Sequence, residues 1–67
     1  MYNTFYVVVL NKANKRSIVG MDCGTLEYAT LIAQQERVRS KRTVFVREYT
    51  QAGLFAQRKL VQEYEVA

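Results

Sequence analysis

Hydrophobic and polar positions along the chain predict two β-hairpins separated by one helix. The segment Tyr2–Leu10 is rich in β-branched and aromatic residues, which is typical of a strand. The polar segment Asn11–Arg16 predicts a hairpin loop, because asparagine tolerates left-handed backbone angles. We expect Ser17–Met21 to be the returning strand, with Gly20 marking a strand end or a bulge. A break at Asp22–Gly24 follows.

The next segment, Thr25–Ser40, has the periodicity of an α-helix. Thr25 can cap its first turn, and the basic residues in its last turns match the helix dipole. Leu31 and Val38 lie beside the main apolar stripe, so we expect a wide apolar side. The residues predicted to form that stripe are Leu26, Tyr28, Ala29, Ile32 and Ala33.

The second half of the chain predicts another hairpin, with a strand at Thr43–Thr50, a turn at Gln51–Gly53 and a further strand within Leu54–Val66. We therefore expect residues 1–67 to form a single small α+β domain of order β-β-α-β-β. A mainly antiparallel four-stranded sheet of order 2-1-3-4 places the two most apolar strands in the middle. One helix would pack on one face of this sheet.

The first strand is apolar on both of its sides, although a single helix covers only one face of a sheet. Exposed contiguous apolar surface usually marks an interaction site. We therefore expect the helix-free face to bind a second copy of the chain or another protein. The alternative is that Leu54, Phe55 and the final segment fold over this face. The candidate interface residues are Tyr6, Val8, Leu10, Phe45 and Tyr49.

Ten Lys and Arg against six Asp and Glu give a net charge of +4. In the expected layout, the first hairpin loop and the end of the helix lie at the same end of the molecule. Such a patch attracts the phosphates of nucleic acids, although cations at a helix C-terminus are favourable without any ligand. The candidate anion-binding residues are Lys12, Lys15, Arg16, Arg39, Lys41 and Arg42.

The sequence offers little catalytic chemistry. It contains no His and a single Cys, which excludes a His-based triad, a Cys/His zinc finger and an internal disulfide. Cys23 precedes the helix, where a thiolate is stabilised, but no His is present to act as its base. A small, partly buried residue in a strand-to-helix turn is the preferred interpretation. We expect no enzyme activity, no metal and no cofactor.

The same features favour the cytoplasm, since small secreted domains usually depend on several disulfides. The longest apolar run, Phe5–Leu10, is far too short to span a bilayer, and no basic segment precedes it as in a signal peptide. We therefore expect neither a membrane association nor a cleaved leader.

These observations predict a small non-catalytic regulatory protein that binds a protein partner and forms a homodimer through the helix-free sheet face. The alternative is a nucleic-acid-binding module that uses the basic patch. The predicted β-β-α-β-β layout resembles that of several small phage-encoded modulators of host enzymes, including some anti-CRISPR proteins and RNA polymerase inhibitors. This architectural resemblance implies a modulator or inhibitor of a host protein.

Overall fold

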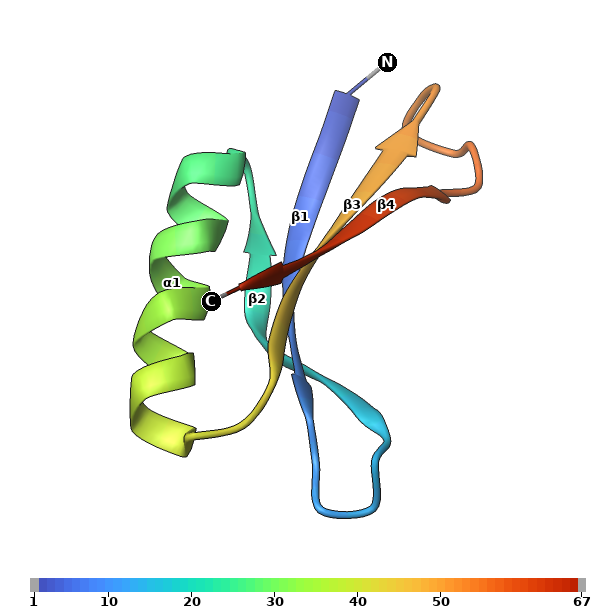
Figure 1. Cartoon of the computed structure of the whole chain (residues 1–67). Helices are drawn as coiled ribbons and strands as arrows, with labels where there is room; N and C mark the ends of the chain where they lie inside the picture. Colours follow the sequence, from blue (N-terminus) through green and yellow to red (C-terminus); the bar gives the residue numbers. More distant parts are fainter. Residues whose placement is uncertain (1, 67) are drawn as a thin grey trace.

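One helix and four strands follow each other in the predicted order (Figure 1). The computed structural model describes residues 2–66. The elements are β1 (Tyr2–Leu10), β2 (Arg16–Cys23), α1 (Leu26–Ser40), β3 (Val44–Gln51) and β4 (Lys59–Val66).

The four strands form one sheet of order β2-β1-β3-β4, in which every neighbouring pair is antiparallel. The helix lies along one face of this sheet (Figure 1). Val7 at the centre of β1 pairs with Val19 of β2 and Val46 of β3. The predicted fold class, strand order and single-helix layer are confirmed.

The strand β2 is longer than expected and contains a bulge, one of the two possibilities that Gly20 suggested. Phe5 pairs with Cys23, while Val7 pairs with Val19. The interval between these two pairs therefore contains more residues in β2 than in β1. Gly20 lies within this irregular stretch with φ +72°, a backbone conformation that side chains disfavour. The bulge therefore lets the strand continue to Cys23 instead of ending at Gly20.

Both ends of α1 have the expected chemical signals. The Thr25 hydroxyl accepts a hydrogen bond from the Tyr28 backbone N–H at 3.2 Å. At the other end, Lys41 has φ 59°, and its N–H donates to the Arg37 carbonyl at 2.9 Å. Within residues 2–66, no helix is long and apolar enough to cross a membrane.

The core lies between α1 and the sheet. Phe5, Val7 and Val9 of β1 face the helix and are buried. The buried residues of α1 itself are Ala29 and Ala33, whose small side chains allow the helix to lie close to the sheet. Tyr28, which we expected in the apolar stripe of the helix, is instead 57% exposed. The helix contacts the sheet through Ala29 and Ala33, and this narrow contact leaves Tyr28 on the outer side.

Candidate functional site

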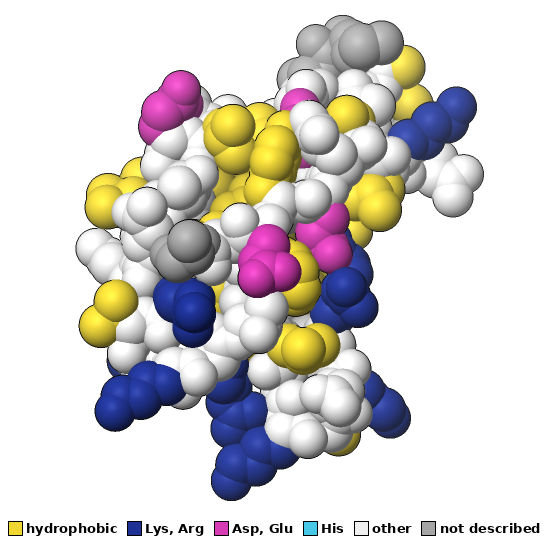
Figure 2. All heavy atoms as spheres, in the orientation of Figure 1, with side chains coloured by type: hydrophobic (Ala, Val, Ile, Leu, Met, Phe, Trp, Pro, Cys, Tyr) yellow, Lys and Arg dark blue, Asp and Glu magenta, His cyan; other side chains and the backbone are white. Residues whose placement is uncertain are grey.

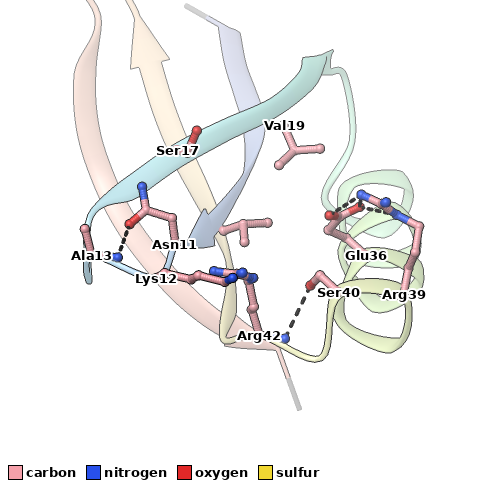
Figure 3. Close-up of a pocket in the computed structure, with 10 residues that line it drawn as sticks. Asn11, Lys12, Ala13, Ser17, Val19, Glu36, Arg39, Ser40 and Arg42 are labelled. Atoms are coloured by element: carbon pink, nitrogen blue, oxygen red, sulfur yellow. Dashed lines mark hydrogen bonds and ion pairs between the residues drawn. The ribbon is translucent and has the colours of Figure 1, made fainter.

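An open groove of about 600 Å³ lies between the β1–β2 loop and the C-terminal end of α1 (Figure 3). Val9 and Val19 form apolar parts of its wall. The polar and charged parts come from the loop, from the start of β2, from the last turns of α1 and from the segment that follows α1. These polar and charged lining residues are Asn11, Lys12, Ser17, Glu36, Arg39, Ser40 and Arg42.

The loop side of the groove is held in one conformation by Asn11. Its side-chain oxygen accepts hydrogen bonds from the backbone N–H groups of Ala13 at 2.9 Å and Lys15 at 3.0 Å. Its own backbone N–H donates to the Lys15 carbonyl at 2.9 Å, and Asn14 takes a left-handed φ of 60°. The loop therefore presents the exposed Lys12 from a defined backbone.

The helix side of the groove carries an ion pair. Arg39 donates to Glu36, one turn earlier in α1, with a shortest N–O distance of 2.6 Å. The hydrogen bond to Glu36 raises the pKa of Arg39 above its ordinary value. Arg42 follows the helix, and its backbone N–H donates to the Ser40 hydroxyl at 3.3 Å. Figure 3 shows Lys12 and Arg42 reaching into the same groove from the loop and from this segment.

The structure brings together part of the predicted set of cations. Lys12, Arg39 and Arg42 line the groove. Lys15 lies in the adjoining loop and Lys41 directly after α1, and both are exposed. Figure 2 shows Lys and Arg side chains gathered at this end of the molecule. Of the ion pairs among residues 2–66, none involves Lys12, Lys15, Lys41 or Arg42.

Arg16, the sixth predicted cation, belongs to a different surface. Its guanidinium lies 5.0 Å from the Phe45 ring centre and donates to both carboxylate oxygens of Glu63, at 3.1 and 3.2 Å. Arg47 donates to the same carboxylate at 2.7 Å. The hydrogen bond from Arg47 lowers the pKa of Glu63, and Arg16 adds to this effect while burial opposes it. Arg16 thus packs on the helix-free face of the sheet.

Aromatic and arginine side chains also meet elsewhere on the helix-free face. The rings of Tyr6 and Tyr49 pack edge to face, with their centres 5.5 Å apart. The Arg58 guanidinium lies 5.4 Å from the Tyr6 ring centre and donates to its hydroxyl. Together with Ile18, these three residues surround a hollow of about 270 Å³.

The helix-free face therefore differs from the apolar surface that the sequence suggested. Val8, a candidate interface residue, is 0% exposed, because the chain's own side chains cover it. The candidates Tyr6, Leu10, Phe45 and Tyr49 are half-buried. Leu54 and Phe55, which the alternative placed over this face, are exposed on the β3–β4 loop. This surface is formed by half-buried aromatic rings, by paired arginines and by the exposed aliphatic side chains of Ile18 and Leu60, which pair with Val8 and Tyr49 in the sheet.

Cys23 lies in the core at the end of β2. Burial, followed by the nearby charge of Asp22, raises the pKa of its thiol above the ordinary value. The N-terminus of α1, which follows Cys23, does not offset these effects, so the side chain behaves as a small core residue.

Sequence reasoning missed Arg47, Arg58 and Glu63 as parts of the helix-free face. The Arg47–Glu63 ion pair had a signal in the sequence. Once the register of β3 and β4 is known, these two oppositely charged residues face each other. It also missed Glu36, the partner of Arg39 three residues later in the helix. In both cases, the charge pattern predicts the ion pair.

No protein-family model, no curated protein and no solved structure matches this chain.

Proposed function

We propose that the chain is a non-catalytic binding protein whose groove between the β1–β2 loop and α1 holds backbone phosphates of a nucleic acid. The observation that carries this proposal is the convergence of Lys12 and Arg42 on one groove, with Lys15 and Lys41 beside it. None of these four cations has an ion pair within residues 2–66. Their charges are therefore available to an external anion.

The uncharged groups of the groove support the same ligand. Asn11, Ser17 and Ser40 line it beside the cations, and amide and hydroxyl groups donate readily to phosphate oxygens. Glu36 is the acidic residue of the lining, and Arg39 neutralises it. The groove therefore combines net positive charge with hydrogen-bond donors.

A protein partner on the helix-free face is the second candidate. The hollow bounded by Tyr6, Ile18, Tyr49 and Arg58 supports it, since tyrosine and arginine are enriched among the residues that dominate protein interfaces. The covered Val8 weakens its original basis, which was exposed aliphatic surface on β1. For this reason, we rank nucleic-acid binding first.

The test is titration of labelled single- and double-stranded oligonucleotides with the protein at several salt concentrations. Four neutralised phosphates predict a slope of log affinity against log salt of about −3.6 for duplex DNA and about −2.8 for single strands. The double variant Lys12→Glu/Arg42→Glu should bind at least about tenfold more weakly.

The matched control is Arg58→Glu/Lys59→Glu, which makes the same change in net charge beside the β3–β4 loop. That loop lies at the opposite end of the sheet from the β1–β2 loop (Figure 1), which lines the groove. Circular dichroism verifies that both variants are folded. Equal losses of affinity in the two double variants would show that total charge, not the groove, attracts the oligonucleotide, and the proposal would be wrong.

A further inference from the structure

The outer side of α1 carries exposed apolar residues opposite the side that packs on the sheet. Tyr28 is 57% exposed, Leu31 50% and Val38 76%. The packed side uses the buried Ala29 and Ala33. The helix is therefore apolar on two opposite sides, of which the sheet covers one.

The outer residues have the spacing of a coiled-coil seam. Tyr28, Leu31, Gln35 and Val38 are separated by three, four and three positions, which places them along one stripe of the helix. A hollow of about 420 Å³ lies on the same side, lined by Leu31, Gln34, Gln35, Val38 and Arg39. The first four of these stand at i, i+3, i+4 and i+7, which is the arrangement of a hole that receives a side-chain knob from a facing helix.

We propose that a second copy of the chain occupies this surface, with the two α1 helices packed antiparallel about a two-fold axis at the level of Ala33. In this alignment, Leu31 of each copy enters the hole formed by Leu31, Gln34, Gln35 and Val38 of the other. Tyr28 of each copy meets Val38 of the other, beyond the ends of the hole. The contact is self-complementary, as a two-fold interface requires.

Charge sets the antiparallel direction. Glu27 lies in the first turn of α1, and Arg37 and Arg39 lie in its last turn. Antiparallel packing places Glu27 opposite the basic end of the other helix, at the level of Arg39, and opposes the two helix dipoles favourably. A parallel pair would place acidic beside acidic and basic beside basic residues.

This interface differs from the one suggested by the sequence, which used the helix-free face of the sheet. A 15-residue helix is about 22 Å long, so the contact is small and the dimer is a weak one. The proposal does not rest on nucleic-acid binding. The stripe shares Arg39 with the groove, and Lys12 and Arg42 lie outside it.

The first experiment is sedimentation of the full chain over a concentration series reaching the millimolar range. We expect reversible dimerisation, and Leu31→Glu should raise the dissociation constant by at least about tenfold, because it places two carboxylates at the centre of the contact. Leu54→Glu introduces the same charge at an exposed loop residue and should leave the dissociation constant unchanged. A wild-type chain that stays monomeric, or a dimer that Leu31→Glu leaves intact, overturns the proposal.

The second experiment fixes the direction and does not depend on how well Leu31→Glu folds. A short bis-maleimide should cross-link Gln34→Cys dimers, because Gln34 lies one residue from the level of the two-fold axis. It should not cross-link Glu27→Cys dimers, whose thiols lie about 18 Å apart along an antiparallel pair. Cys23 is buried and present in both variants, so it serves as the common background. Cross-linking of both variants, or of neither, contradicts the antiparallel pair.

Discussion

Arg16 and Arg42 are both basic residues predicted for the same patch, and the fold assigns them to surfaces of opposite character. On the helix-free face, Arg16 is paired with Glu63 and held against the Phe45 ring. At the groove, Arg42 has no ion pair among residues 2–66 and points toward Lys12. Whether a cation is free to bind an external anion therefore depends more on the side chains that reach it across the sheet than on its place in the chain.

The largest expected effect concerns Val8, which is buried on the helix-free face. Val8→Lys would place an unpaired charge at a fully buried position, so we expect it to lower the free energy of unfolding by about 3 kcal/mol or more. Such a loss is a large part of the stability of a domain this size. Leu54→Lys, at an exposed position, should change it by less than about 0.5 kcal/mol. Urea unfolding measures both; a stable Val8→Lys variant would mean that the face is open.

A smaller effect is expected from Glu63, whose carboxylate pairs with Arg16 and Arg47 on the helix-free face. Glu63→Gln removes the ionic partner of Arg16 and Arg47 and should cost about 1 kcal/mol of unfolding free energy at neutral pH.

The pH dependence of this effect follows from the lowered pKa of Glu63. Its stabilising contribution is complete above the ordinary value of 4.5 and is lost as the pH falls through the lower value of the folded state. The difference between wild type and Glu63→Gln should therefore shrink below pH 4.5, as measured by urea unfolding across the acid range. A difference that stays constant down to pH 2 would show that the ion pairs contribute nothing.

The smallest expected effect concerns the ion pair between Glu36 and Arg39 in the groove. Glu36→Gln frees Arg39 within the groove, so we expect oligonucleotide affinity to rise about threefold and the salt slope to steepen by about 0.9. Glu65→Gln makes the same change in charge on β4, away from the groove lining, and should have a smaller effect. Fluorescence anisotropy titrations measure both. Equal gains from both variants would remove the distinction between the groove and the rest of the surface.

Most of the fold could be predicted from local patterns. The β-branched run of β1, the Thr25 cap and the polar loop around Asn11 each specify their element through nearby residues. The strand order followed from placing the most apolar strands in the middle. The boundary of β2 did not follow, because the bulge at Gly20 depends on pairing with β1.

The candidate site was predictable in part. The presence of Lys12 and Arg42 at one end followed from the expected path of the chain, and they line one groove. The departure of Arg16 did not follow, because its partner Glu63 lies 47 positions away and meets it across the sheet. The outward position of Tyr28 likewise depends on the alanine contact between α1 and the sheet.

The sequence alone determined the elements, their antiparallel arrangement and the end of the molecule where basic residues accumulate, because periodicity, caps and turns act over a few residues. Only the tertiary structure decided which arginines are neutralised, that Val8 is covered and that α1 turns a second apolar side outward. The reason is that long side chains reach across strands to partners far away in the chain. Local sequence patterns do not predict which of these distant residues come into contact.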